Sequence, residues 1–163
     1  MKNDLIQELG TNFIEYAVAV NTDRAIPDAT SGLKPVARRI LWSTFENGRT
    51  FAKPHVKAAR IVGDVMGAYH PHGDSSIYGA LVRLSQNWVM RYPLIDWHGN
   101  NGNIAGDGAA HMRYTEARMK KIAEEILADL DKETVDFQLN FDDTLEEPKV
   151  MPTKIPNLLV NGA

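Results

Sequence analysis

Apolar residues near the N-terminus recur every three to four positions. They are Leu5, Leu9, Phe13, Tyr16, Ala17 and Val20. This spacing places them on one face of an amphipathic helix, which we predict over residues 4–20. The helix should end within TDRAIPDATSGLKP, residues 22–35, because Pro, Gly, Asp, Thr and Ser cluster there. We expect an extended arm or loop at this point.

Three further helices are predicted between residues 35 and 90. The second begins at Pro35, whose fixed φ suits a first helical turn, and the third is predicted over residues 54–67. After the break GAYHPHGD, Gly73 or Asp74 is expected to cap a fourth helix. Its inner face is predicted to hold Ile77, Ala80, Leu81, Leu84 and Trp88. Helix, short turn, helix is the outline of a helix-turn-helix motif.

The sequence changes in character after residue 90. RYPLIDW, residues 91–97, predicts a short strand, and HMRYT, residues 111–115, predicts a strand edge, with a long loop rich in Gly and Asn between them. Thr115 is expected to cap a fifth helix. The apolar stripe of that helix is Met119, Ile122, Ala123, Ile126, Leu127 and Leu130. A two-strand wing beside a helix-turn-helix gives a winged helix, so the predicted fold class is mainly α within α+β.

The composition excludes several kinds of chemistry. The chain of 163 residues contains no cysteine, so disulfides and thiolate metal ligands are excluded. The N-terminus has no apolar leader, and no segment reaches the length of a membrane span. We therefore expect a soluble, cytoplasmic protein with no membrane partner. The length suits one domain with flanking pieces.

Charge is unevenly distributed along the chain. The formal net charge of −3 argues weakly against a nucleic-acid partner. However, residues 34–60 hold seven Lys or Arg and one acid, whereas residues 121–149 hold ten Asp or Glu and three Lys. Such segregation favours a basic face that could bind a polyanion. Two ordinary solvated faces are the alternative interpretation.

Arg113 and Tyr114 stand side by side in GAAHMRYTEARM, residues 108–119. A tyrosine hydroxyl can attack phosphorus when a base accepts its proton and cations stabilise the developing charge. A neighbouring arginine can hold the phosphate with a bidentate fork. The pair alone is weak evidence, because most tyrosines are structural, with half-buried rings and satisfied hydroxyls.

A second candidate is HPHGDSS, residues 70–76. Glycine at the start of a helix leaves backbone N–H groups facing outward, where a phosphate could bind. His70 and His72 could donate hydrogen bonds or move protons near neutral pH. A metal site is a minor alternative, because no third ligand stands at a diagnostic spacing. A turn capped by Asp74, with surface histidines, is the other alternative.

A third candidate is SGLKPVARRI, residues 31–40. Lys34, Arg38 and Arg39 lie on an arm and on the first turns of a helix, and Lys34 and Arg38 are four residues apart. These cations suit contacts to a phosphate backbone, which bind without reading sequence. A solvated helix face is the alternative.

These motifs occur in a specific order along the chain. The stretches are RAIPDATSGLKPVARRILW, KAARIVGDVMGAYHPHGDSSIYGALVRLSQ, AAHMRYTEARM, DKETVDF and VMPTKIPNLLVNGA. Together they closely resemble the A subunit of bacterial type IIA topoisomerases, in its N-terminal breakage-reunion part. The resemblance runs from about residue 5 to the end of the chain and covers DNA gyrase and topoisomerase IV. RLSQNW and HGNNGNI look more like topoisomerase IV of Gram-positive type.

The resemblance implies roles for the residues of the predicted site. Tyr114 matches the tyrosine that attacks the DNA backbone and becomes linked to a 5′ phosphate, and Arg113 matches the arginine that supports this reaction. Arg24 matches an arginine that reaches the same site across the subunits, and His72 matches a histidine near the tyrosine. The residues matching DNA-binding positions are Lys34, Arg38, Arg39, His70, Gly73 and Ser75.

The resemblance also implies an assembly and a domain order. Two such chains would form a DNA gate, and with two B subunits an A2B2 complex that acts on double-stranded DNA. The B subunit, with its TOPRIM and ATPase domains, would bind Mg²⁺ and ATP, and this chain alone is expected to bind no metal. The implied domains are an arm helix at 1–25, a winged-helix DNA-gate domain at 26–140, and the start of a tower domain at 141–163.

Two positions depart from the family pattern. Ala37 stands where gyrase usually has histidine, which affects a peripheral contact. Gly79 stands where the family commonly has an acidic residue, one turn from Ser75, at the site where quinolone drugs lodge. Because that acid normally helps to hold the drug through magnesium and water, we expect a weakened quinolone response with intact cleavage.

Two other functional classes remain open at this point. One is a non-catalytic winged-helix DNA-binding module, which has no need of the Arg113–Tyr114 pair. The other is an interaction protein whose basic face binds an acidic partner and whose first helix pairs with another subunit.

Overall fold

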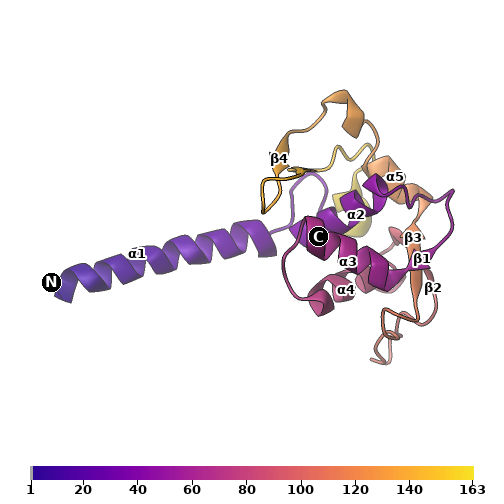
Figure 1. Ribbon diagram of the computed structural model, residues 1–163, viewed down its shortest axis with the longest axis horizontal. Helices are drawn as coiled ribbons and strands as arrows, with labels where there is room; N and C mark the ends of the chain where they lie inside the picture. Colours follow the sequence, from indigo (N-terminus) through magenta and orange to yellow (C-terminus); the bar gives the residue numbers. More distant parts are fainter. Residues whose placement is uncertain (1) are drawn as a thin grey trace.

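The computed structural model describes residues 2–163, with side chains described at 8–21 and 24–163. Its longest element, α1 (Lys2–Val20), projects away from the rest of the molecule (Figure 1). The helix confirms the prediction over 4–20. The side chain of Leu5, part of the predicted stripe, lies outside the described residues. Among the described side chains of α1, five large apolar ones are exposed: Leu9, Phe13, Ile14, Tyr16 and Val18.

A short π-helix, η1 (Asn21–Ala25), ends α1. The Ile26 N–H donates to the Asn21 carbonyl at 2.9 Å, which is the i to i+5 spacing of such a turn. Residues 26–34 then follow an irregular path, as their turn-forming composition predicted. Asp28 organises this stretch, since its carboxylate accepts from the backbone N–H groups of Thr30 and Ser31.

The helix-turn-helix prediction is confirmed. Helices α2 (Pro35–Glu46), α3 (Ala58–Ala68) and α4 (Asp74–Arg83) pack on one another around a fully buried core. Their contributions are Ile40 and Leu41 from α2, Ile61 and Val65 from α3, and Ile77 and Leu81 from α4. The pairs on α3 and α4 are each four residues apart, which keeps each pair on one helix face.

A three-stranded antiparallel sheet covers the far end of the helical unit. Its strands are β1 (Val56–Lys57), β2 (Ile95–His98) and β3 (Glu116–Met119), in the order β1-β3-β2. Ala117 pairs with Val56 on one side and with Trp97 on the other. Ile95, Ala117 and Met119 are fully buried. The opposite face of the sheet carries the charged and polar positions Lys57, Asp96, His98, Glu116 and Arg118.

Several element boundaries predicted from sequence were wrong. The third helix begins at Ala58, because residues 56–57 pair with β3. The fourth ends at Arg83, and Trp88 is 38% exposed instead of lying on its inner face. Residues 112–114 form a turn where a strand edge was expected.

Thr115 caps no helix: it is fully buried, and its hydroxyl lies 3.0 Å from the Tyr78 hydroxyl. The fifth helix, α5 (Lys121–Ile126), begins six residues later. The intervening residues 116–119 alternate between partly exposed and buried positions, and this period of two selects a strand.

The C-terminal part packs back onto the helices. After α5 and a 3₁₀ turn, η2 (Leu130–Lys132), a hairpin forms from β4 (Phe137–Leu139) and β5 (Glu146–Pro148). The Trp42 ring packs edge-on against Phe137, and its indole N–H donates to the Glu146 carbonyl at 3.2 Å. The short α6 (Asn157–Asn161) is tied to the arm by the Asn157 amide, which donates to the Ser31 carbonyl at 2.6 Å. The predicted domain boundaries at 25 and 140 stay predictions.

Candidate nucleophile and nucleic-acid interface

Tyr114 lies on an exposed turn between the glycine-rich loop and β3. Its N–H donates to the His111 carbonyl at 2.9 Å, and its side chain is 65% exposed. The guanidinium carbon of Arg113 lies 4.7 Å from the centre of the Tyr114 ring, a cation–π contact. The predicted pair is therefore adjacent in space as well as in sequence, with the ring accessible from solvent.

The turn is anchored from behind by α3. The first two N–H groups of that helix, from Ala58 and Ala59, donate to the carbonyls of Thr115 and Met112 at 2.9 and 3.1 Å. Helix N-termini have unsatisfied N–H groups, and here the turn satisfies two of them. The backbone on either side of Tyr114 is thus held while its side chain stays exposed.

A purely structural role, with a buried ring and a hydrogen-bonded hydroxyl, fits Tyr69 and Tyr78 better than it fits Tyr114. Tyr69 is buried, and its hydroxyl donates to Glu46. Burial and the Glu46 carboxylate raise the pKa of the Tyr69 hydroxyl well above its ordinary value. Tyr78 is partly buried, and its hydroxyl donates to the Ala110 carbonyl. These two are satisfied structural rings, whereas the Tyr114 ring faces solvent.

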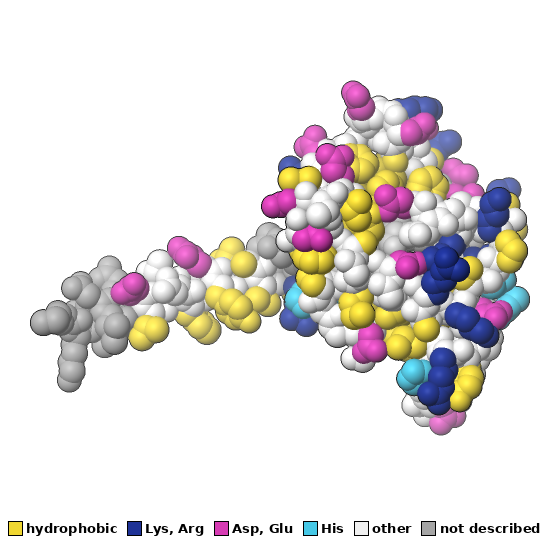
Figure 2. Space-filling view, in the orientation of Figure 1, with side chains coloured by type: hydrophobic (Ala, Val, Ile, Leu, Met, Phe, Trp, Pro, Cys, Tyr) yellow, Lys and Arg dark blue, Asp and Glu magenta, His cyan; other side chains and the backbone are white. Residues whose placement is uncertain are grey.

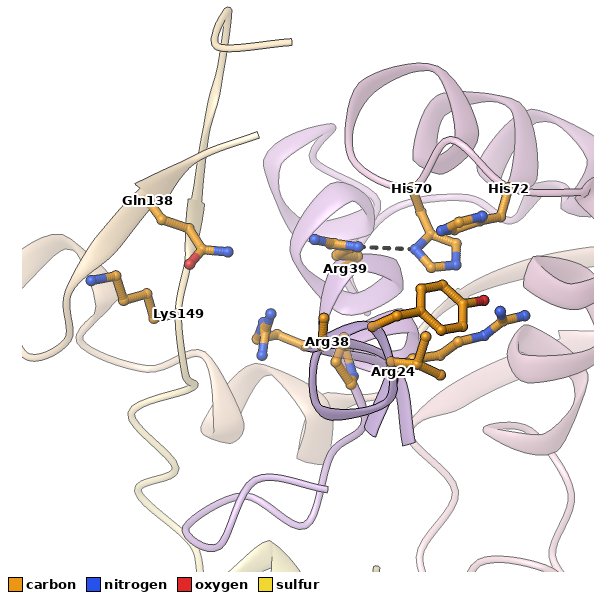
Figure 3. Close-up of a pocket in the computed structure, with 11 residues that line it drawn as sticks. Arg24, Arg38, Arg39, His70, His72, Gln138 and Lys149 are labelled. Atoms are coloured by element: carbon orange, nitrogen blue, oxygen red, sulfur yellow. Dashed lines mark hydrogen bonds between the residues drawn. The ribbon is translucent and has the colours of Figure 1, made fainter. Parts of the chain in front are cut away.

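A cleft of about 720 Å³ gathers most of the predicted cations and histidines (Figure 3). Arg24 reaches it from η1, Arg38 and Arg39 from α2, and His70 and His72 from the turn after α3. Gln138 and Lys149 line the opposite side in Figure 3. Residues from four separate stretches of sequence are therefore brought together. The remaining lining residues are Tyr16, Ala19, Val20 and Pro35.

Arg39 is already engaged by other side chains around the cleft. Its Nε and Nη2 atoms donate to the two carboxylate oxygens of Glu147 at 2.7 and 2.8 Å. Its Nη1 lies 3.0 Å from Nδ1 of His70. The assignment of Arg39 to a DNA contact stays a prediction, and its guanidinium is held by the protein.

His70 is kept neutral in this environment. Burial, followed by the positive charges of Arg39 and its other neighbours His72 and Arg24, lowers the pKa of His70 to about 4. Its ring meets the exposed ring of His72 edge-on, with centroids 4.5 Å apart. The two histidines thus differ: one is buried and fixed, the other faces solvent.

The start of α4 is open, as the HPHGDSS motif suggested. Gly73 occupies the cap position and no side chain caps the helix, so the alternative of a turn capped by Asp74 is wrong. Ser75 is exposed in the first turn, one helical turn before Gly79. A Cβ added to Gly79 would meet no atom within 4 Å. Backbone N–H groups at this end can therefore bind an anion.

Tyr114 and the cleft are separated within one chain. The Tyr114 turn contacts the first residues of α3, while His70 and His72 follow its last residue. The helix has 11 residues and so is about 16 Å long. A single chain therefore does not bring Tyr114 together with Arg24 and His72.

Three residues in or behind the cleft were not found from the sequence: Gln138 and Lys149, which line it, and Glu147, which pairs with the lining residue Arg39. Glu147 lies in the acidic stretch 121–149 among nine other acids, and no motif distinguishes it. Its partner Arg39 stands 108 positions earlier, so only the fold reveals the pair.

The charge segregation seen in the sequence is visible on the surface. In Figure 2, Lys and Arg gather on the side of the three-stranded sheet, and acidic side chains lie over the region of β4 and along α1. Among the described residues, no group of three or more His, Asp or Glu is placed to hold a metal ion. Within the same residues, no helix is both long and apolar enough to cross a membrane.

Comparison with known proteins identifies the family. A family model that describes the A subunit of DNA gyrase/topoisomerase IV matches residues 24–163. The chain is 58% identical over 160 residues to the DNA gyrase A subunit of Deinococcus deserti, and the match covers 98% of this chain and 20% of that protein. It is 59% identical over 160 residues to the protein of the same name from Streptococcus pyogenes serotype M3, covering 98% and 19%.

A third relative, the DNA gyrase A subunit of Staphylococcus epidermidis, is 56% identical over 162 residues, covering 99% of this chain and 18% of that protein. The chain thus spans about a fifth of the length of these relatives. All three relatives carry the gyrase name, and the family model covers gyrase and topoisomerase IV together. The resemblance to topoisomerase IV in particular therefore stays a prediction. The chain belongs to the family of DNA gyrase and topoisomerase IV A subunits.

Proposed function

We propose that this chain is the DNA-gate part of a type IIA topoisomerase A subunit. In this role Tyr114 cleaves and rejoins DNA through a 5′-phosphotyrosine link, which changes supercoiling or decatenates DNA. The observation that carries the proposal is the exposed Tyr114 ring with the Arg113 guanidinium over it, on a turn held by α3. A DNA-binding module without chemistry has no need of this pair.

The cleavage step exchanges one phosphodiester for another. The Tyr114 oxygen attacks phosphorus, the bond from phosphorus to the 3′ oxygen breaks, and the phenol proton leaves while the 3′ oxygen gains one. Because a tyrosine hydroxyl ordinarily stays protonated at neutral pH, this attack needs a proton acceptor and nearby cations. Arg113 supplies a cation at the ring itself. Resealing is the same step reversed.

The site is completed by a second copy of this chain in our proposal. Tyr114 and His72 lie at opposite ends of α3, so Arg24 and His72 would act on the tyrosine of the partner. This arrangement supports the homodimeric gate that the family resemblance implied. The exposed apolar stripe on the projecting α1 is also suited to a subunit contact.

DNA would lie across the cationic side of the cleft. Arg24 and Arg38 line this side, and Lys149 faces them from beyond β5. Lys34, exposed four residues before Arg38 at the start of α2, would extend the path of the DNA beyond the cleft. The uncapped start of α4, with Gly73 and Ser75, offers backbone N–H groups to a phosphate. These contacts recognise the backbone and not the base sequence.

The metal and the nucleotide belong to the partner subunit in this proposal. The described residues offer no cluster for a metal. A B subunit with TOPRIM and ATPase domains would bring Mg²⁺ to the scissile phosphate and would hydrolyse ATP. The working assembly would be A2B2, acting on DNA in the cytoplasm.

A covalent-trapping experiment tests the proposal. The full-length A subunit is mixed with the B subunit, Mg²⁺ and DNA labelled at one end, and the reaction is quenched with SDS. We expect protein to be linked to the strand piece that keeps the 3′-end label, because the link is to a 5′ phosphate. A labelled 5′ end on the protein contradicts the assigned chemistry. DNA binding without any adduct contradicts the catalytic role and leaves the non-catalytic winged-helix module.

A further inference from the structure

A buried carboxylate lies behind the cleft. Glu147 on β5 is 1% exposed, although it lies on a surface hairpin in a strongly acidic stretch. Buried carboxylates are uncommon unless they are paired. Its oxygens accept from Nε and Nη2 of Arg39, and one of them also accepts from the Gln138 amide at 2.9 Å. The charge is therefore fully paired and fully oriented.

The pairing extends to His70. Arg39 donates with Nη1 toward Nδ1 of His70 at 3.0 Å (Figure 3). Arginine is a donor only and always charged, so His70 must accept through Nδ1. A neutral imidazole with an accepting Nδ1 carries its proton on Nε2. The contact thus selects one tautomer of His70.

We propose that Glu147 is a positioning residue of the cleft, which holds the Arg39 guanidinium and thereby fixes the tautomer and the ring plane of His70 beside His72. The inference rests on the proposed function insofar as His72 is assigned a role in cleavage. His70 meets His72 edge-on at 4.5 Å between centroids. A fixed His70 ring therefore restricts where the exposed His72 ring can lie.

Contacts other than those of the Glu147 side chain hold the β4–β5 hairpin against the helices. The Trp42 ring packs on Phe137, its indole donates to the Glu146 carbonyl, and the Asn140 amide donates to the Ala68 carbonyl at 2.6 Å. These contacts hold β4 and β5 against α2 and α3 without the carboxylate. Loss of the carboxylate charge should therefore release Arg39 and not the hairpin.

The first test needs no variant and no DNA. Nitrogen-15 NMR of the imidazoles in the isolated chain reports which ring nitrogen carries the proton. We expect His70 to show a single tautomer, with Nε2 protonated, at neutral pH. A mixture of tautomers, or a proton on Nδ1, overturns the proposal whether or not the protein cleaves DNA.

The second test is Glu147→Gln, with Glu146→Gln as its matched control. Glu146 is the exposed neighbour on the same strand, so the control removes an equal charge without touching Arg39. In Glu147→Gln we expect Arg39 to swing away, a second tautomer of His70 to appear, and the pKa of His70 to rise from about 4 toward the usual range of histidine.

The direction in which the pKa of His70 changes in Glu147→Gln distinguishes a positioning role of Glu147 from a direct effect of its charge on His70. The negative charge of Glu147 by itself raises the pKa of His70. If Arg39 stayed in place, loss of that charge would therefore lower the pKa further. An unchanged tautomer with a lowered pKa overturns the proposal. If Glu147→Gln fails to fold, Arg39→Lys serves instead, because an ammonium lacks the planar fork with which the guanidinium holds Glu147 and His70 at once. A retained single tautomer there has the same meaning.

A third test connects the contact to cleavage in the full-length A subunit with its B subunit. We expect Glu147→Gln to slow adduct formation, by up to about a hundredfold as for a misplaced catalytic group, with the DNA concentration at half-maximal rate nearly unchanged. Glu146→Gln should behave as wild type. Altered tautomers with normal cleavage would overturn the link to the reaction. Wild-type protein that forms no adduct contradicts the proposed function instead, and the NMR result would still stand by itself.

Discussion

Tyr114 and His72 lie at opposite ends of helix α3. The Tyr114 turn accepts hydrogen bonds from the first residues of the helix, and the His72 turn follows its last residue. The helix between them has 11 residues and is about 16 Å long, so within one chain the two side chains cannot act on one phosphate. A reaction that needs both must draw them from two copies of the chain, and this requirement can be measured.

Mixed dimers test the shared site. In a dimer of one Tyr114→Phe chain with one His72→Ala chain, a shared arrangement places both defects in one site and leaves the other intact. Random mixing should therefore restore adduct to about a quarter of the wild-type level, all of it on one strand. Each variant alone is the control. If each site were built within one chain, the mixture would give no more adduct than the variants alone.

Lys34→Gln should weaken DNA binding without changing sequence preference. Lys34 is exposed on the arm before α2 and contacts the backbone in our account. We expect the slope of log Kd against log salt to fall by about one, as for one lost phosphate contact. The matched control is Lys132→Gln, because Lys132 pairs with Asp129 at 2.7 Å on the acidic side. An unchanged slope for Lys34→Gln removes it from the DNA path.

His70 should make the stability of the fold sensitive to acid. Its pKa is about 4 in the fold and has an ordinary value of 6.5, so the unfolded chain takes up the proton first as the pH falls. The free energy of unfolding contributed by neutral His70 is complete above pH 6.5. It is lost as the pH falls toward 4, by up to about 3 kcal/mol. Urea unfolding at pH 7 and 4.5 measures it.

The substitution His70→Gln keeps an acceptor for Arg39 but does not titrate. We expect this variant to lose less stability between the two pH values than wild type does. The exposed His72→Gln should follow wild type. Equal losses in wild type and His70→Gln would show that His70 is not held neutral.

Gly79 offers a test of the departure from the family pattern. A Cβ at this position meets open space, and glycine inside a helix costs about 1 kcal/mol relative to alanine. Gly79→Ala should therefore stabilise the protein and leave the quinolone response weak. Gly79→Asp should increase quinolone-stimulated cleavage. No gain beyond that of the alanine variant would contradict the assignment of Gly79 to the drug site.

The helical core was predictable because its apolar residues repeat at helical spacing within short stretches. The strand at 116–119 was missed, since Met119 also fits the stripe of the following helix and only the pairing with β1 and β2 selects a strand. Tyr114, Arg113 and the cleft residues from Arg24 to His72 stood in recognisable motifs. Glu147 did not, because an ion pair across 108 positions leaves no local pattern.

The most direct measurement compares two tyrosines in the trapping assay. Tyr114→Phe removes one hydroxyl from the proposed nucleophile. Tyr92→Phe is a matched control, because Tyr92 is also exposed and also has a neighbouring arginine, Arg91, over its ring at 5.6 Å. We predict normal DNA binding for both variants, wild-type adduct for Tyr92→Phe and none for Tyr114→Phe. Adduct persisting in Tyr114→Phe would contradict the central claim.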